Sequence, residues 1–193
     1  MNFAILADSH DNVPNLKKAL DWINKQGISL IIHCGDLCAP SMLTKVLIPN
    51  FKGEIHLVHG NVGDPELLEE VAKKIENVQV HGKIGELNLD GKTIAFTHFP
   101  AKAKELAKTG KYDLVFYGHT HKPWMEKLKI VSLREIPRRG KNCKLSPFGR
   151  SPVGGKIVQL VNPGTLAGMF YKATFATFDT ETGELRLKIL EKI

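Results

Sequence analysis

Five short apolar segments of this sequence each end in side chains that can bind a metal ion. Each segment has the length and composition of a buried β-strand. The segments are 3–7, 28–33, 54–58, 92–97 and 113–117, and the polar residues behind them are Asp8, His10, Asp36, Asn61, His98, His119 and His121. Because the carboxyl ends of parallel strands share one edge of a sheet, we expect these seven side chains to lie together at such an edge.

Helix-like segments alternate with these strands. The helices are expected near 12–24, 41–47, 65–75 and 101–108, where apolar residues recur at helical spacing. Further strands are expected near 78–80 and 85–89 and, late in the chain, at 157–161, 173–179 and 184–190, with a tight turn at Asp90-Gly91. Early strand–helix alternation favours a parallel sheet, and the hairpins favour antiparallel strands. The pattern therefore predicts an α/β fold with two sheets.

Length and composition point to one domain that spans residues 1–193. The chain is 42% hydrophobic, which is enough for one sizeable core, and no apolar run is long enough to cross a membrane. The amino terminus has no basic leader, so we expect a cytoplasmic protein. The cysteine count is three, which argues against a disulfide framework.

The positive charge of the chain is concentrated in one segment. Residues 125–156 contain nine basic and two acidic residues, which accounts for the whole formal net charge of +7. We expect a loop or twisted hairpin inserted between core strands. Three interpretations stay open: a solvated hairpin, a lid whose Arg138 and Arg139 grip a second phosphate of the substrate, or a contact to nucleic-acid backbone.

Seven candidate donors exceed what one ion with an open substrate position can use. They suit two ions about 3.5–4 Å apart that share a carboxylate. Asp36 would bridge the two ions. His119 and His121 would serve different ions, which explains their spacing around Thr120. The expected sets are Asp8, His10 and His121 for one ion and Asn61, His98 and His119 for the other.

The donor chemistry narrows the choice of metal. Imidazole nitrogens together with carboxylate and amide oxygens, and no thiolate, favour Mn, Fe, Co, Ni or Zn over copper(I). The four histidines disfavour pure Mg or Ca sites. We expect two divalent ions, with Mn as the first choice.

The same residues form motif blocks that resemble a known family. The blocks are D-x-H at Asp8–His10, G-D at Gly35–Asp36, G-N at Gly60–Asn61, the single His98, and G-H-x-H at Gly118–His121, followed by N-P-G at 162–164. In this order they resemble the calcineurin-like metallophosphoesterases, and most of all the small single-domain YfcE-type phosphodiesterases of bacteria and archaea.

The resemblance implies a four-layer α-β-β-α sandwich, built from two mixed β-sheets flanked by helices, with a dimetal site at the edge of the sheets. It implies hydrolysis of phosphate esters, a phosphodiesterase or a phosphomonoesterase activity on a small substrate. A hydroxide between the metals would attack phosphorus in line, with Asp36 and Asn61 as the catalytic residues. One departure is Val62, where many members have a histidine that aids departure of the leaving group.

Two other functions compete with this hypothesis. A non-catalytic scaffold on the same fold, as in the related retromer subunit, would fit a chain that had lost the metal-site histidines, and this chain retains His10, His98, His119 and His121. A nuclease that uses the basic segment is the third hypothesis, although related nucleases carry additional DNA-binding domains. Small relatives often pair, so a homodimer is also an expectation.

Overall fold

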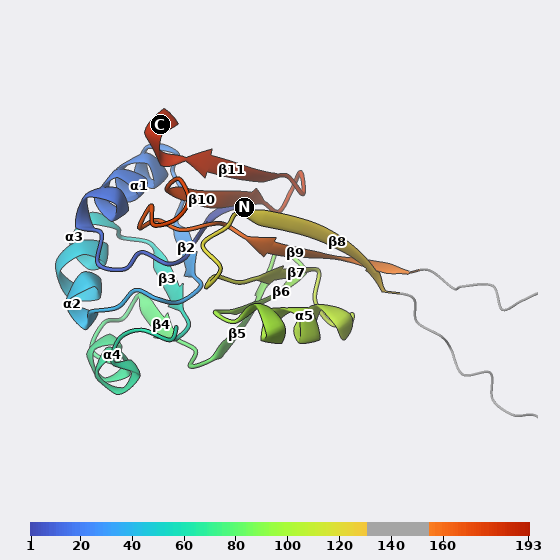
Figure 1. Ribbon diagram of the computed structural model, residues 1–193, viewed down its shortest axis with the longest axis horizontal. Helices are drawn as coiled ribbons and strands as arrows, with labels where there is room; N and C mark the ends of the chain where they lie inside the picture. Colours follow the sequence, from blue (N-terminus) through green and yellow to red (C-terminus); the bar gives the residue numbers. More distant parts are fainter. Residues whose placement is uncertain (131–154) are drawn as a thin grey trace, which may run out of the picture.

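Two β-sheets pack face to face, and helices cover their outer faces (Figure 1). The computed structural model describes residues 1–130 and 155–193. The two termini of the chain lie close to the first sheet, because β1 near the amino terminus and β10 near the carboxyl terminus are neighbours in it. The predicted two-sheet α/β architecture with four layers is confirmed.

The first sheet has six strands in the order β11-β10-β1-β2-β3-β4. The strands β1 to β4 run parallel, and β10 is antiparallel to both β1 and β11. Their bounds are β1 (Asn2–Leu6), β2 (Leu30–His33), β3 (Glu54–Leu57), β4 (Val78–Val80), β10 (Thr174–Asp179) and β11 (Leu185–Ile189).

The second sheet has five strands in the order β5-β6-β7-β9-β8. The central strands β6, β7 and β9 run parallel, and the edge strands β5 and β8 are antiparallel to their neighbours. The predicted turn at Asp90-Gly91 joins β5 to β6 with φ of 48° and 74°, the positive values that a tight hairpin turn requires. The bounds are β5 (Ile84–Leu89), β6 (Lys92–Thr97), β7 (Leu114–Phe116), β8 (Trp124–Ile130) and β9 (Lys156–Asn162).

The helices form the two outer layers. The first helix, α1, begins behind Asn12, whose side chain accepts a hydrogen bond from the backbone N–H of Asn15 and so caps the first turn. Pro14 lies in the first turn, where its missing N–H costs nothing. The helical elements are α1 (Val13–Lys25), α2 (Pro40–Met42), η1 (Leu43–Leu47), α3 (Ile48–Asn50), α4 (Pro65–Ala72), α5 (Pro100–Lys108) and η2 (Leu190–Lys192).

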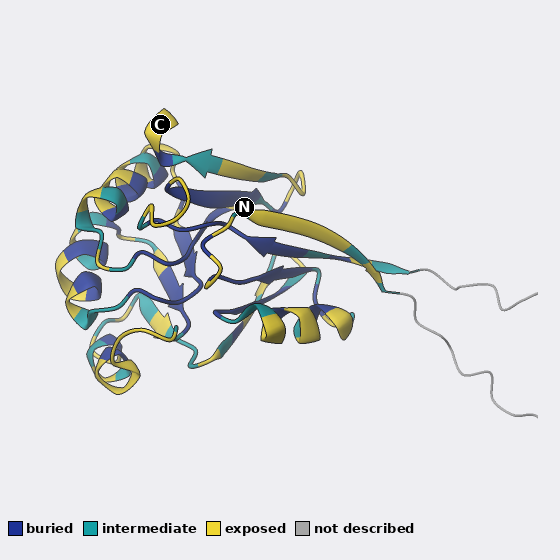
Figure 2. Cartoon of the chain, viewed as in Figure 1, coloured by how far each residue is buried: buried dark blue, intermediate teal, exposed yellow. Residues whose placement is uncertain are grey.

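Three apolar layers hold these elements together, and they form the buried interior in Figure 2. In β1, alternate side chains enter different layers, as the two-residue period of a strand requires: Phe3 and Ile5 lie between the sheets, and Ala4 and Leu6 face the helices. Between α5 and the second sheet, small residues such as Ala103 and Ala107 allow close packing. Burial on both faces of both sheets fixes the register of the strands that carry the site.

The predicted basic insertion is described only in part. Its first residues form β8, which pairs with β9 from Trp124↔Asn162 to Ile130↔Lys156. Arg138 and Arg139 lie outside the described residues, so their expected role as a phosphate grip stays a prediction. No helix in the described part of the chain is long and apolar enough to cross a membrane.

Candidate metal centre

The seven predicted residues follow the carboxyl ends of five strands, as expected, but these strands belong to two sheets. The expectation of a single sheet edge is wrong, because β6 and β7 pair in the second sheet and β1, β2 and β3 in the first. The site therefore lies where the ends of two packed sheets meet. Asp8 and His10 follow β1, Asp36 follows β2, Asn61 follows β3, His98 follows β6, and His119 and His121 follow β7.

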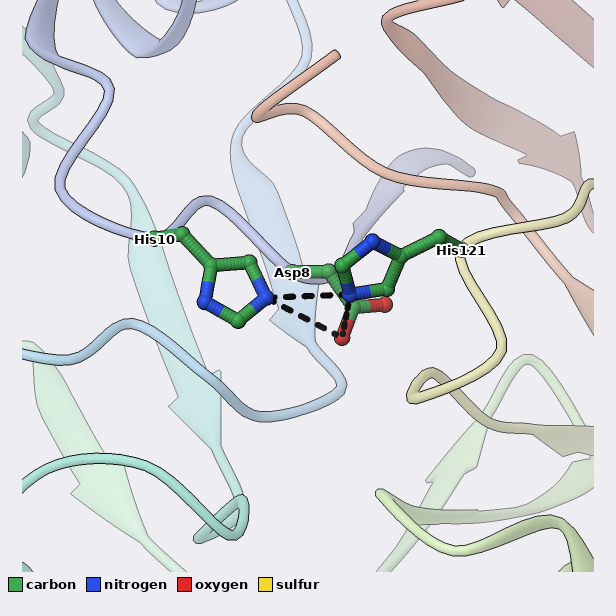
Figure 3. Close-up of side chains that lie close together, drawn as sticks. All are labelled: Asp8, His10 and His121. Carbon is green, nitrogen blue, oxygen red and sulfur yellow. Dashed lines mark hydrogen bonds and ion pairs between the residues drawn. The ribbon is translucent and has the colours of Figure 1, made fainter. Parts of the chain in front are cut away.

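The first group of converging side chains is Asp8, His10 and His121 (Figure 3). The Nε2 atoms of His10 and His121 lie 3.0 Å apart. Oδ1 of Asp8 lies 3.9 Å from Nε2 of His10 and 3.6 Å from Nε2 of His121. Two ring nitrogens and one carboxylate oxygen thus face a common point, although His121 is more than a hundred positions from the other two residues.

The second group is Asn61, His98 and His119. Oδ1 of Asn61 lies 2.8 Å from Nε2 of His98 and 2.8 Å from Nδ1 of His119. The two ring nitrogens are themselves 3.2 Å apart. His98 is fully buried, whereas Asn61 and His119 are exposed to solvent. This group therefore has a closed inner side and an open outer side, where a substrate can enter.

Asp36 lies between the two groups. Its Oδ1 accepts hydrogen bonds from the backbone N–H groups of Asn61 and Val62, both at 2.9 Å. Its Oδ2 lies 3.7 Å from Nε2 of His10 and 3.4 Å from Nε2 of His98, one histidine from each group. The backbone thus fixes one oxygen of the carboxylate and leaves the other free to face both groups at once.

The backbone at this site adopts conformations that side chains disfavour. Five of the seven residues have positive φ, a conformation that costs a non-glycine residue about 1–3 kcal/mol. Such strain persists where the surrounding structure dictates the conformation, and it concentrates at functional sites. The residues are Asp8, His10, Asp36, His119 and His121, with φ between 41° and 71°.

Close backbone approach explains two glycines of the motifs. A Cβ at Gly60 would overlap the carboxylate of Asp36, so only glycine lets that chain pass over it. A Cβ at Gly118 would lie 2.9 Å from Oδ2 of Asp8, which is tighter than real Cβ contacts. The next residue, His119, donates its backbone N–H to both oxygens of Asp8, at 3.1 and 3.0 Å. The glycines thus let neighbouring strand ends pack against the carboxylates.

The last residue of β9 and the segment behind it tie the strand ends together. Asn162 donates through Nδ2 to the carbonyl of Gly118 and to Oγ1 of Thr120, both at 2.9 Å. Thr165 donates through Oγ1 to the carbonyl of Asp8 at 2.8 Å. Asn162, the first residue of the N-P-G turn that the resemblance singled out, thus holds the strand end that bears His119, and Thr165, directly behind the turn, holds the one that bears Asp8.

The electrostatics of the site favour positive charge at its centre. Burial raises the pKa of Asp8 to about 7, although the nearby His98 works against this rise. Burial also opposes ionisation of Asp36, but hydrogen bonding and attraction from His98 outweigh it and lower the pKa of this carboxyl. For His98, burial opposes the charge, yet Asp36 raises the pKa of the imidazole. Burial therefore favours the protonated form of Asp8, and the Asp36 carboxylate favours a proton on His98.

The donor atoms fit metal ions. Nδ1 of His98 lies 3.0 Å from the carbonyl oxygen of Cys34, which can only accept, so Nδ1 carries a proton. In the neutral ring, Nε2 then has a lone pair that faces Oδ1 of Asn61, which is also an acceptor. Two lone pairs at 2.8 Å need a proton or a cation between them. The carbonyl also orients the ring, as partners of metal-bound histidines do.

Three residues near the site, Ser9, His33 and Cys38, are not among the predicted metal ligands, although His33 precedes Asp36 in the chain and could be expected to support its carboxylate. Sγ of Cys38 lies 3.5 Å from Nδ1 of His10. Nε2 of His33 lies 3.2 Å from Oγ of Ser9, between Asp8 and His10, and burial lowers the pKa of His33 to about 3, so this ring stays neutral. The sequence could indicate His33, because a histidine is unusual on a buried strand. It could not indicate Cys38, because the contact of Cys38 depends on a loop conformation that the sequence pattern does not specify.

Comparison with known proteins decides the family. A family model described as the calcineurin-like phosphoesterase superfamily domain matches residues 1–183. The chain belongs to the calcineurin-like phosphoesterase superfamily. The predicted family is confirmed, and together with the phosphodiesterase relative described next it confirms the predicted phosphoesterase class.

Several relatives share this superfamily fold over nearly the whole chain. Phosphodiesterase MJ0936 of Methanocaldococcus jannaschii is 27% identical over 195 residues, which cover 99% of this chain and 100% of the relative. The solved structure of an archaeal phosphodiesterase superposes with a TM-score of 0.73 at 24% identity, over 98% of this chain and 99% of that chain. The phosphoesterase YfcE from E. coli superposes with a TM-score of 0.59 at 16% identity, over 98% and 100% of the two chains.

Proposed function

We propose that the chain hydrolyses phosphodiesters with two divalent metal ions held by the seven side chains. The observation that carries this proposal is the position of Asp36, whose Oδ2 faces one histidine of each group at 3.7 and 3.4 Å. A carboxylate placed in this way is what a pair of ions needs to share. The first ion would be held by Asp8, His10 and His121, the second by Asn61, His98 and His119, and Asp36 would contact both.

Bound at these groups, the two cations would neutralise the anionic ester and lower the pKa of a water that they share. The residues of the chain supply the orientation. Asn61 is fixed on both sides by His98 and His119, so its amide can hold an equatorial oxygen of the phosphate. The nitrogen and oxygen donors suit Mn first, and Fe, Co, Ni or Zn after it.

A diester with a good leaving group is the proposed substrate class. Val62 is 48% exposed and follows Asn61 directly, at the position where the family resemblance expects a histidine. Valine can neither donate nor accept a proton, so the departing oxygen leaves as an anion or takes its proton from water. The archaeal relative MJ0936 is named as a phosphodiesterase, which supports this choice.

The test is reconstitution of activity with metal. Protein depleted of metal with a chelator is expected to gain hydrolysis of bis(4-nitrophenyl) phosphate when Mn is returned, and Asp36→Asn is expected to abolish it. Asp21→Asn is the matched control, because Asp21 is an exposed carboxylate on α1 and belongs to neither group of converging side chains. Full turnover in Asp36→Asn, or wild-type activity without any metal, would show the proposal to be wrong.

A further inference from the structure

An exposed aromatic ring lies over one histidine of the metal centre. Phe170 is 89% exposed, and its ring centroid lies 5.7 Å from that of His121, with 44° between the ring planes. Its neighbours Met169 and Tyr171 are also exposed, at 42% and 43%. A phenyl ring gains from burial, so a ring held in solvent beside an open site has a free face for another group.

The backbone holds Phe170 in this place at a cost. Its φ is 65°, a left-handed conformation that is unusual for a bulky residue and costs about 1–3 kcal/mol. The loop is anchored on both sides of the ring. Ala167 donates its N–H to the carbonyl of Asp8 at 3.0 Å, and Thr174 donates to the carbonyl of Thr165 at 2.8 Å. The ring is thus attached, through a short loop, to the backbone of a candidate metal ligand.

The second group of the site, Asn61, His98 and His119, also has an aromatic neighbour. Phe99 packs against the rings of His98 and His119, with centroids 5.1 and 5.6 Å apart. Unlike Phe170, Phe99 is partly buried, so that ring supports the histidines and offers less surface to a ligand. The strongly exposed ring therefore lies on the side of the first group, beside His121. Nε2 of His121 lies 3.0 Å from Nε2 of His10, which in turn lies 3.7 Å from Oδ2 of Asp36. The ring thus borders the group of side chains that faces Asp36.

We propose that Phe170 stacks on a planar aromatic group of the substrate, an aryl ester or a nucleobase, and so sets the specificity of the site. This inference rests on the proposed phosphodiesterase function and names the substituent that the site selects. Aromatic rings stabilise one another in offset or edge-to-face arrangements at centroid distances of about 4.5–7 Å. Bases also stack on exposed aromatic side chains in proteins that bind single-stranded nucleic acid.

The test compares two symmetric diesters, diphenyl phosphate and dimethyl phosphate, as ligands of the manganese-loaded protein. Their affinities are measured by titration calorimetry and as inhibition of bis(4-nitrophenyl) phosphate hydrolysis. Symmetric ligands avoid the question of which substituent faces Phe170. Wild-type protein is expected to prefer diphenyl phosphate. In Phe170→Ala this preference falls about tenfold, because the ring that stacks is gone, while dimethyl phosphate loses at most about twofold.

Two further variants complete the experiment. Phe170→Tyr retains a planar ring and is expected to keep the preference. Tyr171→Ala, which removes the exposed neighbour, is the matched control and is also expected to keep it. If both ligands weaken alike in Phe170→Ala, the ring only positions His121, and the inference is wrong; equal affinities in wild type and Phe170→Ala overturn it as well. Wild-type protein that binds neither diester and hydrolyses nothing would instead overturn the proposed function, and this inference with it.

Discussion

The two carboxylates of the site are expected to affect the stability of the metal-free protein in opposite directions. Asp8 is fully buried, and its pKa is raised from 3.8 to about 7, mainly by burial. A pKa that is raised in the folded state contributes stability that is fully present below pH 4 and is lost as the pH rises through 7. The shift is about three pH units at about 1.36 kcal/mol each, so the loss by pH 8 is at most about 4 kcal/mol.

Asp8→Asn removes this loss, because the amide carries no charge and its oxygen can still accept the N–H of His119. We expect the variant without metal to be more stable than wild type at pH 8 by about 2–4 kcal/mol, and nearly equal to it at pH 4. Asp36→Asn should behave in the opposite way. The pKa of Asp36 is lowered, so its carboxylate stabilises the fold above its unfolded pKa, and removing the charge lowers stability at pH 8.

The assay is urea or thermal unfolding of chelator-treated protein at pH 4, 6 and 8. A gain of 2–4 kcal/mol corresponds to about 5–15 °C in the melting temperature of a chain of this length. With manganese present, wild type should gain stability and Asp8→Asn should gain much less. The reasoning is refuted if metal-free Asp8→Asn is less stable than wild type at pH 8, or if the two variants shift in the same direction there.

Three other changes have defined outcomes. Gly60→Ala should lose manganese binding in calorimetry, because its Cβ overlaps the carboxylate of Asp36. Gly82→Ala has open space around its Cβ but a strained φ of 67°, so it should lose some stability and still bind manganese as wild type does; equal binding by both variants would contradict the contact. Cys38→Ala should weaken manganese binding by about three- to tenfold, because the thiol of Cys38 contacts Nδ1 of His10 and orients its ring. Unchanged affinity would show that the thiol does not orient the ring of His10. Val62→His should speed hydrolysis of diesters with poor leaving groups by about tenfold or more, because a histidine can donate a proton to the departing oxygen. The rate should then depend less steeply on the pKa of the leaving group; an unchanged dependence would rule out proton donation from this position.

The pattern of the sequence was sufficient for most of the fold. The capped start of α1 behind Asn12 and the turn at Asp90-Gly91 follow from local chemistry, so the residues themselves specify them. The edge strand β8 was expected only as part of a loop or hairpin. It is mostly exposed and mixes charged residues with Met125, Leu128 and Ile130, so its alternation is weak as a signal of a buried strand.

The residues of the candidate site were predictable from the sequence, but their arrangement between two sheets was not. Strand ends identify Asp8, Asp36 and His98, but no local pattern says that His98 comes from a second sheet, because sheet membership depends on long-range pairing. The place of Phe170 beside His121 was also not predicted. Its position results from the anchoring of a loop to the backbone of Asp8, a contact between residues far apart in the chain.

The central claim is that two ions share Asp36, and diffraction at the manganese absorption edge from crystals grown with that metal tests it most directly. We expect two anomalous peaks about 3.5–4 Å apart, each within bonding distance of the Asp36 carboxylate, with His10 and His121 on one and His98 and His119 on the other. A single peak, or two peaks that do not share this carboxylate, would contradict the account.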